Sequence, residues 1–289
     1  MGRFPSVSII IPTRNSAHIL SVALSGIKAQ NYPKDKLETI VVDNESTDDT
    51  RKIAKSFAAK VYTLRGKPPL VCQQRNKGAQ MAKGDYLLFL DHDMELSKGL
   101  LLDFAKKLAK NKEIDGWFIP EQIITGSRYL TTLRNFERNF YNQTPIDAVR
   151  IIEKETFFKT ELQYDPLLSG GPGDWDIDIQ LKEAGCRFGS ISKPLRHHEE
   201  RLGGLLKYIS KKGDWSGGID AYVKKWQKKY RGRYQYIIDQ QLGLKYRIFT
   251  VFFEKGKWRS VIARPHLYIM VLCIKLAMLC LSKVKKYYG

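Results

Sequence analysis

Two aspartates separated by one residue, Asp91 and Asp93, follow the strongly apolar stretch Asp85–Leu90 (DYLLFL). The apolar run is typical of a buried strand, so both carboxylates and the intervening His92 leave the strand at its carboxyl end. Such a pair suits a hard divalent cation whose other ligands are diphosphate oxygens, and the ion stabilises the charge of a departing diphosphate. Because the pattern is also common in plain surface turns, its meaning depends on the residues that surround it.

Polar residues follow two other predicted strands in the same way. Helical patterns separate the strands over the first 110 residues, which predicts βαβ units and a mainly parallel sheet. Ligands of such sheets bind at the carboxyl ends of the strands, so the polar clusters are expected to form one site. The two strands and their clusters are Val7–Ile11 with Pro12, Thr13, Arg14 and Asn15, and Leu37–Val42 with Asp43 and Asn44.

Four ordered segments resemble glycosyltransferase family 2, whose members are inverting enzymes of the GT-A fold. They are VSIIIPTRN (7–15), ETIVVDNESTDDT (38–50), RNKGAQMAKGDYLLFLDHD (75–93) and GDWDIDIQLKEAG (173–185). The resemblance implies an α/β, Rossmann-like, mostly parallel sheet flanked by helices. It places the catalytic domain in residues 1–200, with a nucleotide-binding half at about 1–110 and an acceptor half at about 111–200. Residues 201–289 are then a basic, partly hydrophobic helical extension.

The resemblance also implies residues for binding the nucleotide sugar. Thr13 and Asn15 fall near the base and ribose, and Asp43 accepts a hydrogen bond from a ring N–H of the base. Asp91 and Asp93 contact ribose and metal, with Asp93 the more direct ligand of Mn²⁺ or Mg²⁺. The complete expected nucleotide-binding set is Pro12, Thr13, Asn15, Asp43, Arg75, Asp91, His92 and Asp93. The alternative for Asp43 and Arg75 is a plain turn residue and a surface charge.

Asp174 is the candidate catalytic base. An inverting transfer needs a carboxylate beside the acceptor hydroxyl, on the face opposite the departing diphosphate. Family members commonly carry Glu-Asp at this point, whereas this chain has Gly173 followed by Asp174. The neighbouring Asp176 is expected to cap or pair within the helix.

Two adjacent histidines, His197 and His198, follow a predicted strand. In related enzymes a histidine at this point ligates the metal or touches the diphosphate, and imidazole is an acceptable ligand for manganese. Two neighbouring side chains cannot easily face one ion, so the sequence leaves open which of them is the ligand. The alternative is a pair of surface histidines.

The charge of the chain is concentrated in its last 89 residues. The whole chain has 49 basic and 30 acidic residues, and residues 201–289 carry 20 and 4 of these. Leu267–Leu281 is nearly continuous apolar sequence, shorter than the roughly 20 residues that span a bilayer. A basic, amphipathic segment of this kind is expected to lie on an anionic membrane. A helix that completes a core or a homodimer interface, or a solvated lysine-rich face, is the alternative.

These observations favour an enzyme, a glycosyltransferase that uses a UDP- or GDP-sugar. The tail favours a polyprenyl-phosphate or lipid-linked glycan as acceptor. With no signal-peptide pattern and four scattered cysteines, we expect a reducing compartment and peripheral attachment at the cytoplasmic face of the cell membrane. A soluble transferase acting on polysaccharides or small molecules is the main alternative. A nucleic-acid-binding protein lacks a recognisable module, and a nucleotidyltransferase lacks the glycine-rich phosphate loop.

Overall fold

The computed structural model describes residues 4–168, 171–199, 218–230 and 232–288. The chain forms two compact units. Unit 1 comprises residues 1–121 and 148–197, and unit 2 comprises residues 122–147 and 198–289. The change of unit near residue 197 lies close to the domain boundary expected near residue 200. Residues 122–147 also belong to unit 2, which was not predicted from the sequence.

Unit 1 is built on a seven-stranded sheet with the order β3-β2-β1-β4-β8-β6-β9. β1, β2, β3 and β4 run parallel, β8 is antiparallel to both β4 and β6, and β9 is parallel to β6. The predicted mostly parallel sheet is therefore present. Its strands are β1 (Val7–Thr13), β2 (Leu37–Asp43), β3 (Lys60–Thr63), β4 (Tyr86–Phe89), β6 (Gly116–Phe118), β8 (Val149–Glu153) and β9 (Phe188–Ser190).

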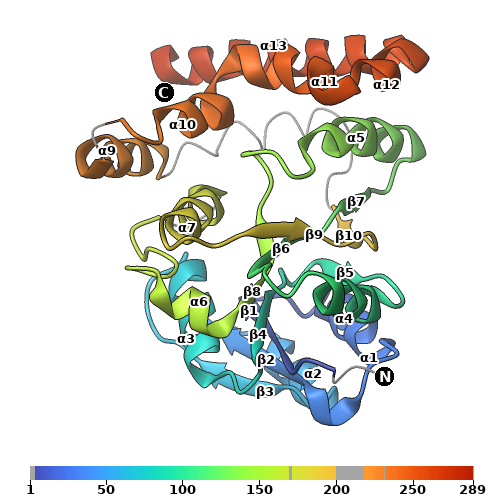
Figure 1. Cartoon of the computed structure of the whole chain (residues 1–289), viewed down its shortest axis with the longest axis vertical. Helices are drawn as coiled ribbons and strands as arrows, with labels where there is room; N and C mark the ends of the chain where they lie inside the picture. The colour runs from blue at the N-terminus through green and yellow to red at the C-terminus, as the bar shows by residue number, and fades with distance from the viewer. Residues whose placement is uncertain (1–3, 169–170, 200–217, 231, 289) are drawn as a thin grey trace. The chain divides into compact units, whose positions relative to one another are not determined.

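Helices cover both faces of this sheet, and the alternation of side chains along β1 explains why. Ile9 and Ile11 point into one apolar layer, and Ile10 points into the other. The first layer is closed by α1, α2 and α4 and the second by α3, α6 and α7, on opposite sides of the strands in Figure 1. These helices are α1 (Leu20–Lys28), α2 (Thr50–Ser56), α3 (Val71–Met81), α4 (Leu100–Lys110), α6 (Lys154–Lys159) and α7 (Gly171–Glu183); a short 3-10 turn, η1 (Lys34–Lys36), precedes β2.

A second, three-stranded sheet has the order β5-β10-β7. Its strands are β5 (Met94–Leu96), β7 (Glu121–Ile124) and β10 (Leu195–His198). β10 runs antiparallel to β5, with His197 opposite Met94. This pairing brings the predicted histidine segment next to the residues that follow Asp93.

Apart from parts of β7 and β10, the regular structure in the described residues of unit 2 is helical, and the unit has its own apolar core. The core consists of one face of α13, including Leu267 and Val271, packed against aromatic residues such as Phe136 and Phe252. The helical elements of unit 2 are α5 (Arg128–Tyr141), α9 (Ile219–Tyr230), α10 (Gln235–Leu242), η2 (Tyr246–Thr250), α11 (Val251–Phe253), η3 (Glu254–Gly256), α12 (Trp258–Ala263) and α13 (Pro265–Tyr288). Within the described residues, no helix combines the length and the apolar character needed to cross a bilayer.

Candidate active site

Arg75 joins two of the predicted site carboxylates. Its Nη1 donates to Asp174 Oδ1 at 2.5 Å, and its Nη2 donates to Asp91 Oδ1 at 2.8 Å. The Arg75 side chain is only 4% exposed, and its guanidinium also lies 4.9 Å from the centre of the Tyr164 ring. A buried guanidinium is stable only when it is paired, and the two carboxylates provide that pairing. Arg75 is therefore not the surface charge that the alternative interpretation allowed.

A second buried arginine continues the chain of charges from Asp91. Arg150 Nη1 lies 3.3 Å from Asp91 Oδ2, and its Nη2 lies 3.2 Å from Glu121 Oε1. Glu121 Oε2 lies 3.7 Å from His197 Nδ1, and His197 Nε2 lies 3.5 Å from Asp93 Oδ2. We call this set the ion chain. It consists of seven side chains of unit 1, in the order Asp174, Arg75, Asp91, Arg150, Glu121, His197 and Asp93.

The ion chain controls the charge state of its members. Burial alone works to raise the pKa of Asp91, but Arg75 and Arg150 outweigh it and hold that pKa well below its usual range. Burial works against protonation of His197, but Asp93 and Glu121 outweigh it and raise the His197 pKa to about 10. Asp91 is thus ionised with both oxygens engaged, and His197 is protonated at neutral pH while no metal is bound.

The elements that carry these residues explain their convergence. Asp91 and Asp93 lie in the turn after β4, where the Met94 N–H donates to the Asp91 carbonyl at 3.0 Å. Arg75 lies in the middle of α3, which packs on β1 and β2. Asp174 lies in the first turn of α7. The carboxyl ends of the parallel strands and the helices beside them therefore meet at one edge of the sheet. This is the edge at which the sequence predicted a site around Asp91 and Asp93.

The other predicted nucleotide-binding residues order the loops after β1 and β2. Asp43 is fully buried and accepts hydrogen bonds from the Ser46 backbone N–H at 2.9 Å, from the Ser46 hydroxyl, and from Thr13 Oγ1 at 3.3 Å. Asn15 has a left-handed backbone, with φ of 47°, and its Oδ1 accepts from the Thr47 N–H at 2.9 Å. Pro12 lies inside β1, paired with Val42 of β2.

The start of α7 distinguishes Asp174 from Asp176. Asp174 is about 20% exposed, whereas Asp176 is fully buried and accepts from Gln180 Nε2 at 2.7 Å. Asp176 therefore has the structural role expected for it. A Cβ on Gly173 would lie 2.7 Å from the Leu168 carbonyl oxygen and 2.9 Å from Cys72 Sγ. The close packing of this segment leaves no space for the glutamate that family members commonly carry there.

The donor atoms around Asp93 fit part of a metal shell. The Asp93 carboxylate and the His197 imidazole face each other, and carboxylate with imidazole suits Mn²⁺, whereas Mg²⁺ keeps to oxygen ligands. His198 follows His197 in β10 and so points to the opposite face of the strand. Among the described residues, no group of three or more His, Cys, Asp or Glu side chains is arranged to hold a metal ion. A metal ion at this position would need diphosphate oxygens or water as its remaining ligands.

Three residues of the site were missed from the sequence: Glu121, Arg150 and Tyr164. Arg150 is a single charge within the apolar run Val149–Ile152. A charged residue in a buried strand must have a partner, and this was the signal that could have identified it. The sequence around Glu121 and around Tyr164 has no clear apolar pattern, so neither residue gives such a signal.

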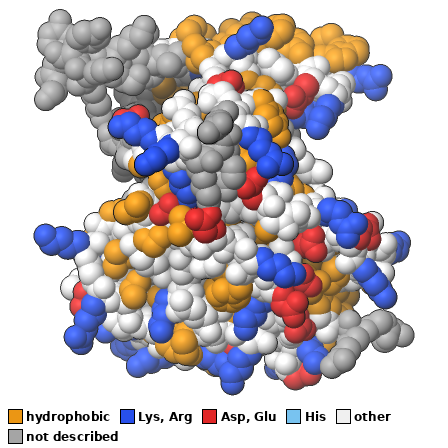
Figure 2. Space-filling view, turned by 60° about the vertical axis from the view of Figure 1, so that its left-hand side comes forward, with side chains coloured by type: hydrophobic (Ala, Val, Ile, Leu, Met, Phe, Trp, Pro, Cys, Tyr) orange, Lys and Arg blue, Asp and Glu red, His pale blue; other side chains and the backbone are white. Residues whose placement is uncertain are grey.

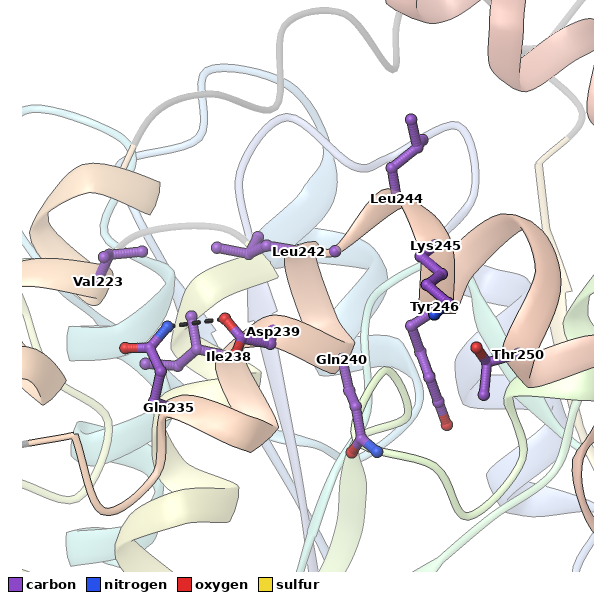
Figure 3. A pocket seen from close by; sticks show the side chains of 11 residues that line it. Val223, Gln235, Ile238, Asp239, Gln240, Leu242, Leu244, Lys245, Tyr246 and Thr250 are labelled. Carbon is purple, nitrogen blue, oxygen red and sulfur yellow. Dashed lines mark hydrogen bonds between the residues drawn. The ribbon is translucent and has the colours of Figure 1, made fainter.

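An open cavity in unit 2, about 690 Å³ in volume, contains none of the predicted site residues. Figure 3 shows Leu242, Leu244 and Lys245 along its rim, with Gln235 Nε2 donating to Asp239 Oδ1 at 2.8 Å. Because none of the residues that line the cavity belongs to the ion chain, we assign the cavity no part in the chemistry.

A mostly parallel sheet that carries an Asp-x-Asp turn after its central β4 strand has the organisation of a GT-A glycosyltransferase. The model of the family described as "Glycosyl transferase family 2" matches residues 8–161, more than half of the chain. The chain belongs to glycosyl transferase family 2. This confirms the fold class and the enzyme class predicted from the sequence.

Two similar proteins illustrate the relationship. The poly(ribitol-phosphate) β-N-acetylglucosaminyltransferase TarS of Staphylococcus aureus is 29% identical over 54% of this chain, which spans 30% of TarS. A PGL/p-HBAD biosynthesis glycosyltransferase of Mycobacterium bovis is 30% identical over 61% of this chain and 69% of its own length.

Solved structures share the fold at lower identity. TarS residues 1–349 with UDP-GlcNAc match with a TM-score of 0.60 at 16% identity, over 94% of this chain and 81% of that one. The mannosyltransferase PcManGT of Pyrobaculum calidifontis, with GDP-Man and Mn²⁺, matches with a TM-score of 0.58 at 17% identity, over 99% and 85%.

Replacing Arg75 with methionine, of similar length but uncharged, should destabilise the protein strongly. Asp91 would lose one of its two arginines and Asp174 its Arg75 contact, and breaking a buried ion pair typically costs about 3–5 kcal/mol. Urea denaturation measures the loss. Arg65→Met is the matched control, because Arg65 is 89% exposed and 3.9 Å from Glu45, and we expect it to change stability by less than about 0.5 kcal/mol. Similar effects for the two variants would contradict the importance of the ion chain.

Proposed function

We propose that this protein is an inverting glycosyltransferase that transfers a sugar from a UDP- or GDP-sugar to an acceptor hydroxyl or phosphate. The observation that carries the proposal is the Arg75 bridge, which places a partly exposed carboxylate, Asp174, beside the Asp-x-Asp turn. One end of the ion chain then serves the donor diphosphate and the other end serves the acceptor. That TarS and PcManGT have been solved with UDP-GlcNAc and GDP-Man supports a nucleotide-sugar donor.

On the donor side, we propose that Asp93 and His197 hold a divalent metal ion, with Asp91 beside them and His198 outside the site. When bound, the ion neutralises charge on the departing diphosphate. Asp91 is held by Arg75 and Arg150, so the arginines position it for ribose or diphosphate and hold its charge. Thr13, Asn15 and Asp43 shape the loops at which the base binds, with Pro12 and His92 as adjacent contacts.

On the acceptor side, Asp174 removes the acceptor proton as the hydroxyl attacks the anomeric carbon. Arg75 holds Asp174 beside Asp91, so the proposed base lies next to the proposed donor site. We propose that the acceptor approaches the sugar from the side of Asp174, on the face opposite the departing diphosphate. Direct displacement inverts the anomeric configuration and forms no covalent enzyme intermediate.

The acceptor is proposed to be a polyprenyl-phosphate or lipid-linked glycan, met at an anionic membrane surface at the cytoplasmic face. The outward face of α12 and α13 supports this, because three of its apolar side chains are more than half exposed: Ile262 is 68%, Ile269 58% and Leu276 55% exposed. Figure 2 shows hydrophobic side chains gathered over this part of unit 2, with basic side chains beside them. An exposed apolar face with a basic border suits an anionic membrane. A second copy of the chain is the competing occupant.

The substitution Asp174→Asn should abolish transfer, because the amide cannot accept the proton. Binding of the nucleotide sugar should change little, because Arg75 keeps its ion pair with Asp91 and the amide oxygen at position 174 can still accept from Arg75. Activity and donor affinity are measured on the same preparations. Asp178→Asn is the control one turn further along α7: its carboxylate accepts from the Val149 N–H at 3.2 Å, which an amide oxygen can also do. Retained turnover in Asp174→Asn would contradict the assignment of the base.

The double substitution Ile269→Glu and Leu276→Glu should weaken binding to vesicles containing phosphatidylglycerol at least about tenfold. Burying an aliphatic side chain contributes roughly 1.5–3 kcal/mol, and two such contributions would be lost. Co-sedimentation with vesicles measures the effect. Phe158→Glu with Leu162→Glu, at exposed apolar positions of unit 1, is the control that should bind normally. Absence of wild-type binding, or a dimer that the substitutions dissociate, would contradict the membrane proposal.

A further inference from the structure

Glu121 is a buried carboxylate with two different partners. Its side chain is 8% exposed at the start of β7. Oε1 lies 3.2 Å from Arg150 Nη2, and Oε2 lies 3.7 Å from His197 Nδ1. Each carboxylate oxygen of Glu121 therefore faces a different side chain, Oε1 facing Arg150 and Oε2 facing His197.

Both partners of Glu121 contact the Asp-x-Asp turn. Arg150 Nη1 lies 3.3 Å from Asp91 Oδ2, and His197 Nε2 lies 3.5 Å from Asp93 Oδ2. A single carboxylate thus connects to both aspartates through two different side chains. The three strands that carry Glu121, Arg150 and His197 are β7, β8 and β10, so secondary structure fixes the positions of all three backbones.

We propose that Glu121 is a positioning residue of the donor site: it holds Arg150 against Asp91 and orients the His197 ring so that Nε2 faces Asp93. This inference rests on the proposed function. A carboxylate on one ring nitrogen of a histidine leaves the other nitrogen as the ligand and fixes the orientation of the ring. The 3.7 Å between Glu121 Oε2 and His197 Nδ1 is an ion-pair distance, longer than a direct hydrogen bond. With Nδ1 turned towards Glu121, Nε2 faces Asp93.

Glutamine cannot replace Glu121 in this role, although it has the same shape. A carboxylate offers two acceptor oxygens, whereas the amide offers one oxygen and one NH₂ group. In Glu121→Gln the NH₂ group must therefore face either the Arg150 guanidinium or His197 Nδ1. One of the two side chains then loses its contact with a carboxylate oxygen, and the His197 ring or Arg150 is free to turn.

The test is the affinity for Mn²⁺ alone, measured by the electron paramagnetic resonance signal of the free ion, with no donor and no turnover. Loss of such a supporting residue typically weakens metal binding 10–100-fold, and we expect this for Glu121→Gln. Glu121→Asp keeps both oxygens and should recover part of the affinity. The control is Glu38→Gln, which removes a different ion pair of unit 1, to Lys60 at 2.6 Å, and should leave Mn²⁺ affinity unchanged.

The results that would overturn the inference differ in what else they affect. Equal Mn²⁺ affinity in wild type and Glu121→Gln removes the positioning role alone. Equal weakening in Glu38→Gln shows a general loss of stability, and removes it too. A wild type that binds nucleotide sugars but no Mn²⁺, with or without a nucleotide sugar, removes both this role and the metal, and leaves the transferase. If Glu121→Gln fails to fold, Glu121→Asp with wild-type affinity is the contradicting result.

Discussion

The site depends on the pairing of Arg75 with Asp91 and Asp174. An ionised carboxylate or a guanidinium removed from water costs several kcal/mol unless a partner of opposite charge compensates it. Arg75 compensates two carboxylates that belong to different parts of the chain, one after β4 and one at the start of α7. Its position on α3 is in turn fixed by the packing of that helix on β1 and β2. The core therefore determines where the chemistry can occur.

Arg150 and Glu121 extend the series of ion pairs from Asp91 to His197. Because the charges alternate along the ion chain, each of its members is stabilised by a neighbour of opposite charge. An array of this kind is pre-organised, so that little rearrangement is needed when an anionic diphosphate binds. The same organisation explains why Asp91, with both oxygens engaged by arginines, is better suited to hold position than to coordinate a metal directly.

Local sequence was sufficient for the parallel half of the sheet and for the Asp-x-Asp turn. The runs that became β1, β2 and β4 are apolar and end in polar residues, and both features are visible in consecutive residues. The antiparallel strand β8 was not predicted, because its pairing with β4 joins segments about 65 residues apart, and Arg150 was missed with it. The choice between His197 and His198 also needed structure, since only the register of β10 shows which ring faces Asp93. The helix α3 begins at Val71, which places Arg75 within it.

Calorimetric titration of the wild-type protein with a panel of UDP- and GDP-sugars, each with and without Mn²⁺, tests the central claim most directly. Saturable binding of a nucleotide sugar that is strengthened by Mn²⁺ is the expected result, because the ion chain offers a partial metal shell next to a diphosphate site. Absence of binding by every nucleotide sugar, with and without the metal, would contradict the assignment of this edge of the sheet as a donor site.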